Sequence, residues 1–477
     1  MATNPHSNLS RLVVKAMGLF GSVQVVGILC SIVRNKLVAL WIGPAGVGLF
    51  GLFNQALEMM ATATNLGVRT SSVRDISQTM KSGDATALAR IIVVVRRWSL
   101  WLGLAGALLM LSLAPWLSRV TFGNEDYQWG FVALSTAVLL MALTNGEQAV
   151  LQGLARLKRL ARVGLWGSLG GLLVSVPLFY WLRERSIVPS IIAYAACAAL
   201  AAWLLRDRDH KAVPVSAATT VAMGTGFVRL GIFMTLGSFV GLLADYVFRA
   251  WLTHVSIAEV GLYNAGVTLF TKYTGLVFTA LGMEFFPRLA AVVHSKLRVR
   301  AYVGQEIMLA LTVLAPVLSL FIVLRDPIVA LLYSEEFAGI ATFVSWGMVG
   351  IIFKAVSWCM AFVIVARGSG MIFLAVEALD ALVGITLNIT FYQLWGLDGL
   401  GASFVAWYIV YAVIVAVVYY GHYRLRLPAA VAGHVLWTAL AVGLVMWLME
   451  LGLAWLAAAV TAVVLLISLL LLRRLWR

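Results

Sequence analysis

The chain has 477 residues, of which 62% are hydrophobic and only 12% are charged, and its mean hydropathy is +0.96. No soluble domain needs so much apolar surface, so the composition excludes that class. The formal net charge of +15 comes from 35 Lys and Arg against 20 Asp and Glu. Because these cations separate apolar segments and do not form a stripe with aromatic residues between them, we expect no nucleic-acid partner.

Apolar segments long enough to cross the hydrocarbon layer as α-helices recur from end to end. A membrane β-barrel would instead show segments of about 10 residues that alternate in polarity, and this pattern is absent from the sequence. We therefore predict an all-α polytopic membrane protein with about 14 transmembrane helices. The predicted segments are residues 11–38, 44–67, 91–117, 129–151, 163–182, 187–205, 227–252, 257–283, 303–324, 339–365, 372–393, 399–420, 430–449 and 452–472.

The connecting segments predict the orientation, because cytoplasmic loops are rich in Lys and Arg. With the amino terminus placed inside, the basic connections 68–90 and 206–226 also fall inside. The outside connections are poorer in cations and include the acidic stretches 123–127 and 334–337. Both termini are therefore predicted to be cytoplasmic.

An internal repeat relates the two halves of the chain. A single offset aligns residues 46–50 with 259–263 and places Lys36 on Arg249. Transporters are often built from two such halves, and here each half begins at its cytoplasmic end, which predicts a parallel pseudo-repeat of two six-helix lobes. The predicted domains are an amino-terminal lobe at 1–210, a carboxy-terminal lobe at 211–425 and an extra helix pair at 426–477.

Ionisable side chains inside apolar segments are costly in hydrocarbon, so by default they indicate a transport path. Lys272 and Lys354 lie near the middle of their segments with apolar turns on both sides. We expect both to face an interior cavity. The alternative is a structural ion pair with Glu58 or Glu306, which also lie deep in their segments.

The first helix of each half carries a further cation near its outer end. Asp245 and Arg249 can pair on one helix face, but Arg249 is also the repeat mate of Lys36. Arg34 lies two residues from Lys36, about 200° around a helix, so the two cannot line one face of a cavity equally well. The candidate substrate-binding residues are Lys36, Arg249, Lys272, Lys354 and Arg34, and the candidates for coupling or charge balance are Glu58, Asp245 and Glu306.

A cavity with more Lys and Arg than carboxylate favours an anionic substrate, and phosphate is the usual partner of these groups. A multidrug exporter would show the opposite balance, and a membrane polymerase or ligase would carry a large outer loop. The sequence lacks HExxH, GxSxG and P-loop motifs, and its three Cys lack metal-ligand spacing. We therefore expect no catalytic residue, no metal and no cofactor.

The order of several short motifs resembles a known family. The motifs are Lys36 with the following LVALWIGPAGVGLFGLFNQ, FGNEDYQ at 122–128, EVGLYN at 259–264, FFPRLA at 285–290 and the stretch 331–358. Over roughly residues 10–425 they resemble Wzx-type lipid-linked oligosaccharide flippases of the O-antigen and enterobacterial-common-antigen type. These belong to the polysaccharide-transporter branch of the multidrug/oligosaccharidyl-lipid/polysaccharide (MOP) exporter superfamily.

The resemblance implies a protein of the bacterial inner membrane that moves an undecaprenyl-pyrophosphate-linked sugar repeat unit to the periplasmic leaflet by alternating access. It implies membrane lipids and the polymerase and chain-length proteins of the same pathway as partners. Lys36, Arg249 and Lys354 stand where similar members carry basic residues, whereas Arg34, Glu58, Lys272 and the terminal helix pair depart from the pattern. A flippase for another prenyl-linked precursor, such as a peptidoglycan or teichoic-acid unit, is the main alternative.

Overall fold

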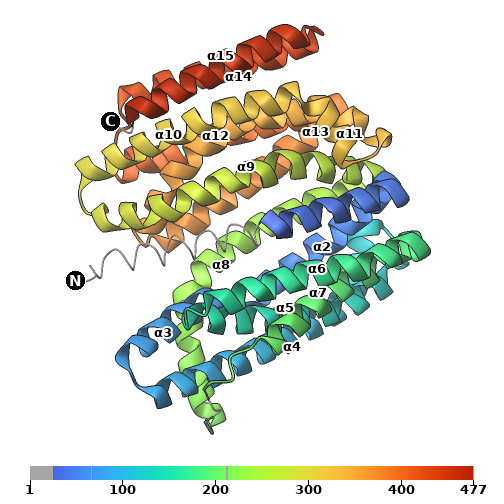
Figure 1. Ribbon diagram of the computed structural model, residues 1–477, viewed down its shortest axis with the longest axis vertical. Helices are drawn as coiled ribbons and strands as arrows, with labels where there is room; N and C mark the ends of the chain where they lie inside the picture. The colour runs from blue at the N-terminus through green and yellow to red at the C-terminus, as the bar shows by residue number, and fades with distance from the viewer. Residues whose placement is uncertain (1–24, 66, 211–212, 476–477) are drawn as a thin grey trace, which may run out of the picture. The chain divides into compact units, whose positions relative to one another are not determined.

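The computed structural model describes residues 25–65, 67–210 and 213–475, and these residues form helices and no strand (Figure 1). The predicted all-α class is confirmed. A helix over residues 25–41 comes first. It is followed by α2 (Gly43–Asn65), α3 (Val68–Ser82), α4 (Ala85–Phe122), α5 (Gln128–Gly153), α6 (Leu157–Leu182), η1 (Arg183–Ser186), α7 (Ile187–Leu204), α8 (Ala217–Thr253), α9 (Ile257–Val292), α10 (Lys296–Val323), α11 (Arg325–Leu332), η2 (Glu335–Ile340), α12 (Ala341–Ala366), α13 (Gly370–Val417), η3 (Val418–His422), α14 (Ala429–Glu450) and α15 (Ala454–Leu475).

The predicted apolar segments correspond to helices whose ends differ by a few residues, except that α4, α6, α8, α9 and α10 extend further into the polar connections. Residues 11–24 of the first predicted segment lie outside the described residues. Nine helical stretches of the described chain are long and apolar enough to cross a membrane, and two of them, Leu157–Leu204 and Gly370–His422, each contain two predicted segments. α2, which carries Asn54, Gln55 and Glu58, is not among these nine.

α13 contains two predicted segments because the chain breaks its helix only at Gly396. This glycine has φ 62° and ψ −143°, a conformation that a residue with a Cβ does not adopt. Three side-chain hydrogen bonds then join the two arms in antiparallel order, which shows that α13 is a tight helical hairpin. They link Ser403 to Asn388 at 2.6 Å, Trp407 to Asp380 at 2.6 Å and Tyr411 to Glu377 at 3.2 Å.

Tertiary contacts divide the chain into two compact units, Met1–Ile257 and Ala258–Arg477. The first unit includes α8, because this helix packs against α2, α3 and α4. The boundary between the two units therefore lies after α8. The internal repeat instead predicts a lobe boundary before α8, between residues 210 and 211. The lobe boundaries of the repeat stay a prediction.

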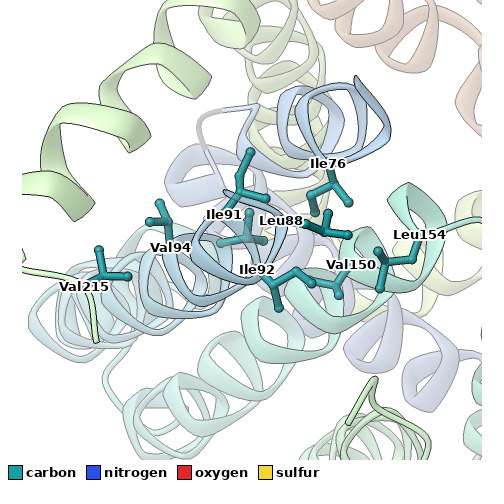
Figure 2. Close-up of a cluster of buried hydrophobic side chains, with 9 residues drawn as sticks. Ile76, Leu88, Ile91, Ile92, Val94, Val150, Leu154 and Val215 are labelled. Carbon is teal, nitrogen blue, oxygen red and sulfur yellow. The ribbon is translucent and has the colours of Figure 1, made fainter. Parts of the chain in front are cut away.

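In the first unit, most of the predicted connection 68–90 is helical, because Val68–Ser82 form the amphipathic helix α3 and α4 begins at Ala85. Ile76 of α3 is fully buried against Leu88 and Ile92 of α4 and Val150 of α5 (Figure 2). Val215, which precedes α8, joins the same cluster. The apolar side of α3 therefore packs against the other helices of this unit.

In the second unit, the extra helix pair α14 and α15 packs on α10 (Figure 1). The carboxy-terminal end of α14 is fixed by Arg325, which is only 8% exposed. Its guanidinium donates to Ser345 Oγ at 2.8 Å and to a Glu450 carboxylate oxygen at 2.5 Å. The terminal pair is thus a packed part of this unit.

Candidate substrate-binding site

The first unit contains a cavity with a volume of about 300 Å³. The helix over residues 25–41 contributes to its wall together with α2, α5 and α7. The wall combines apolar side chains with a few convergent polar groups, as ligand sites usually do. These polar groups are Arg34, Asn54, Glu58, Thr144, Asn145 and Tyr194.

The guanidinium of Arg34 is held in this cavity by two aromatic rings. Its Cζ lies 4.4 Å from the ring centroid of Tyr194 and 4.9 Å from that of Phe50. Cation–π contacts of this kind position the charge without neutralising it. The Nε of Arg34 is buried without a hydrogen-bond partner, and Arg34 makes no ion pair with an acidic side chain within the described part of the chain. Arg34 therefore keeps donor capacity for an anion.

Polar groups continue from this cavity toward α3. Asn145 of α5 lines the main cavity and also a smaller one of about 20 Å³, which Thr64 and Asn65 line too. The Asn145 Oδ1 accepts a hydrogen bond from Arg69 Nη1 at 3.2 Å. Amide and hydroxyl groups thus connect the surroundings of Arg34 with a second guanidinium.

The other cations of the first unit lie in different surroundings. Lys36 shares the helix of Arg34, but it is not among the side chains that line this cavity. Arg249 is buried and forms an ion pair with Asp245 on α8, as the spacing of four residues allows. Of the two cations before GPAGVG, the structure therefore places Arg34 on the cavity.

In the second unit, Lys354 of α12 lies against the hairpin of α13. Its Nζ is 5.2 Å from the ring centroid of Tyr408, and the carboxylate of Asp380 is within electrostatic range. The indole of Trp407 donates to that carboxylate at 2.6 Å, and Tyr411 donates to Glu377 one turn away at 3.2 Å. Lys354 is thus balanced by α13, and not by an ion pair with Glu306 in the part of the chain that the structure describes.

Lys272 lies on α9 and Glu306 on α10. Lys272 is exposed on α9. Glu306 of α10 is half-buried, and its Oε1 has no hydrogen-bond partner. The charges nearest to Glu306 belong to Glu284 and Arg288, which pair with each other on α9.

The uncharged side chains that contact these cations could not be predicted from the sequence. Tyr194 and Asn145 in the first unit, and Trp407 and Tyr408 in the second, have no sequence pattern that separates them from ordinary interface aromatics or amides. Within the described residues, no group of three or more His, Cys, Asp or Glu is arranged to hold a metal ion.

The fold is that of the MOP-superfamily transporters. The solved structure of lipid II flippase MurJ in its inward closed conformation matches with a TM-score of 0.64 and 11% identity, over 96% of this chain and 100% of that one. An inward-facing multidrug resistance MATE family transporter of the MOP superfamily matches with a TM-score of 0.67 and 17% identity, over 86% and 95% of the two chains. These matches show that the chain shares the fold of these transporters.

The family can be stated more closely. Residues 37–342, more than half of the chain, match the family described as polysaccharide biosynthesis protein, and the chain belongs to that family. The lipid III flippase of Escherichia coli (strain K12) is 23% identical over 408 residues, which cover 79% of this chain and 91% of that protein. The lipid III flippase of Shigella flexneri matches to the same extent.

Proposed function

We propose that this protein is a flippase that moves undecaprenyl-pyrophosphate-linked oligosaccharide repeat units from the cytoplasmic to the periplasmic leaflet of a bacterial inner membrane. Its family name refers to polysaccharide biosynthesis, and proteins similar to it in sequence or fold are named lipid III and lipid II flippases. The proposal includes cytoplasmic positions for both termini, which rest on the distribution of Lys and Arg in the loops.

The observation that carries the proposal is the Arg34 cavity. A pyrophosphate moved through hydrocarbon would meet a large desolvation cost, which fixed cations in a hydrated cavity offset. Arg34 supplies a guanidinium that is positioned by Phe50 and Tyr194 and has an unused buried donor. Asn54 and Asn145 add amide groups of the kind that bind sugar hydroxyls, while the prenyl tail stays in lipid.

The transport cycle in this proposal is alternating access between lobes 1–210 and 211–425. Lys36 and Arg249 are matching cations of the two lobes, and Lys272 and Lys354 are further contacts for the substrate. Glu58, Asp245 and Glu306 balance charge or couple transport to an ion gradient. The polymerase and chain-length proteins of the same pathway would receive the product.

A flippase for another prenyl-linked cell-wall precursor is the second candidate, and the fold likeness to lipid II flippase favours it. A multidrug exporter for cations is disfavoured because the cavity presents Arg34 without an acidic ion-pair partner among the described residues.

The test is a conditional deletion of the gene in a strain without a redundant flippase, followed by leaflet-resolved measurement of prenyl-pyrophosphate-linked glycans. We expect the oligosaccharide-linked form to accumulate in the cytoplasmic leaflet and periplasmic delivery to resume when the gene is restored. Accumulation of a peptidoglycan precursor instead would favour the second candidate. Unchanged delivery of both classes would contradict a flippase function.

A further inference from the structure

A second group of basic and polar side chains lies at one end of the second unit, away from Lys354. It consists of Arg300 near the start of α10, Arg367 directly after α12, and Tyr419 and Tyr423 at the end of the α13 hairpin. We call these four residues the tyrosine–arginine cluster. All four groups can donate hydrogen bonds, and the cluster contains no carboxylate.

Three polar atoms of the cluster are buried without a hydrogen-bond partner. They are the Nε of Arg367 and the hydroxyl oxygens of Tyr419 and Tyr423. Tyr419 is 1% and Tyr423 5% exposed. Leaving such groups unsatisfied is costly, and a ligand that accepts several hydrogen bonds would satisfy all three.

The charges of the cluster are equally uncompensated. The guanidinium of Arg367 stacks on the Tyr423 ring, with its Cζ 4.5 Å from the centroid. The Tyr419 hydroxyl lies within electrostatic range of both Arg367 and Arg300. Neither arginine forms an ion pair with Asp or Glu among the residues that the structure describes. Arg300 is exposed, so it forms the open side of the cluster, and the buried Tyr419 forms its floor.

The backbone around the tyrosines departs from a regular helix. Residues Val418–His422 form a π-helical turn, and the amide of Leu425 bonds to the Tyr419 carbonyl at 3.0 Å. Arg424 between them has φ 50°, which is unfavourable for a residue other than glycine. Single π-helical turns and strained residues are frequent at binding and catalytic sites.

From this arrangement we propose that the tyrosine–arginine cluster binds a phosphate group, either the headgroup phosphate of an anionic lipid or free inorganic phosphate. Guanidinium groups match the geometry of phosphate oxygens, and the two phenols add donors from the buried side. Lys296 at the start of α10 and Arg426 close to Tyr423 in sequence are exposed and add positive charge. In the predicted orientation this end of the second unit faces the cytoplasm. The site does not depend on the proposed transport function.

Ligand-dependent thermal stability of the purified full-length protein in detergent tests the site. The probes are sodium phosphate, dioctanoyl-phosphatidylglycerol and, as a control for the acyl chains, dioctanoylglycerol without phosphate. We expect the phosphate-bearing probes to raise Tm and dioctanoylglycerol not to do so. Arg300→Gln with Arg367→Gln should weaken the response about tenfold or more. Arg298→Gln, which removes a nearby exposed charge, should leave it unchanged.

Tyr419→Phe and Tyr423→Phe test the floor of the site without disturbing the stack on Arg367. Because each removes an unsatisfied buried hydroxyl, we expect an unchanged or higher Tm without ligand and a weaker response to phosphate. These variants decide the question if the double arginine variant does not fold.

The two phosphate-bearing probes, sodium phosphate and dioctanoyl-phosphatidylglycerol, distinguish the source of the phosphate. A response to phosphatidylglycerol alone would assign the site to lipid headgroups, and a response to inorganic phosphate alone would assign it to a soluble anion. The proposal is wrong if neither probe stabilises the protein. It is also wrong if the cluster variants respond as strongly as Arg298→Gln.

Discussion

The indole nitrogen of Trp407 donates a hydrogen bond to Asp380 Oδ1 at 2.6 Å across the two arms of the α13 hairpin. Both residues are partly buried, and the carboxylate also lies within electrostatic range of Lys354. A charged acceptor strengthens this bond relative to a neutral one. The hairpin therefore depends on a polar contact near a cation that the sequence singles out.

We expect Trp407→Phe to lower the free energy of unfolding by about 1–2 kcal/mol, because it leaves the Asp380 carboxylate without its donor. The measurement is thermal unfolding of the purified protein, with Trp395→Phe as the control, since Trp395 is 61% exposed. Equal stability of the two variants would show that the bond contributes nothing measurable.

A partly buried ion pair links α4 to α5. Arg96 binds Glu147 through Nε and Nη2 at 2.7 and 3.0 Å, and Nη2 also donates to the carbonyl of Asp207. Arg96→Gln should destabilise the protein by about 2–3 kcal/mol, because it leaves the partly buried Glu147 carboxylate without an ion-pair partner. Arg119→Gln breaks the more exposed pair with Glu125 and should cost less than about 1 kcal/mol. Chemical or thermal unfolding compares the two, and a larger loss for Arg119→Gln would refute this ranking.

Arg34 provides a test of the cavity itself. Arg34→Gln should reduce transport about tenfold or more, because the cavity loses its positioned charge. Arg34→Lys should retain part of the activity, since an ammonium keeps the charge but not the planar contact with Tyr194. Leaflet-resolved transport assays with equal amounts of inserted protein give the comparison, with the exposed Arg185→Gln as control. Full activity of Arg34→Gln would remove Arg34 from the site.

Close packing in the second unit depends on small residues. A Cβ at Gly347 of α12 would overlap the ring of Phe270, whereas a Cβ at Gly443 of α14 would meet no atom within 4 Å. Gly347→Ala should therefore cost about 1–3 kcal/mol through overpacking. Gly443→Ala should be neutral or stabilising by up to about 1 kcal/mol, because alanine favours the helix. Thermal unfolding of both variants checks this, and a tolerant Gly347→Ala would mean that Phe270 can move away.

The start of α4 should depend on pH. The pKa of the exposed Asp84 carboxyl is lowered, mainly because the backbone N–H of Ala87 donates to it and then because the Thr86 hydroxyl does. A lowered folded-state pKa means that the cap stabilises the helix fully above the unfolded-state pKa of about 3.9 and loses this contribution as the pH falls through the folded-state pKa. Amide hydrogen exchange at Thr86 and Ala87 should thus lose protection on acidification.

Asp84→Asn is the matched control, because asparagine caps a helix but does not titrate. In that variant, protection at Thr86 and Ala87 should no longer change in the acidic range. The same loss of protection in both proteins would assign it to another group.

Much of the fold follows from the sequence because lipid imposes a simple rule: an apolar run of sufficient length must be a helix. The residues that define the site are harder to predict. Arg34 and Lys36 lie on different sides of one helix, and the sequence does not show which side faces the cavity. In the structure Arg34 lines it. The partners of Arg34 and Lys354 are uncharged rings, so their role depends on tertiary contacts between distant segments.

The hairpin at Gly396 has a consequence for how the chain enters the membrane. Because its two arms are joined by one glycine and no polar loop, the insertion machinery meets α13 as a single apolar run of 48 residues. Because the turn needs both arms, we expect the arms to enter the bilayer as a pair. A reporter inserted at residue 396 would disturb biogenesis, whereas the polar connection 206–216 offers a better point for a topology tag.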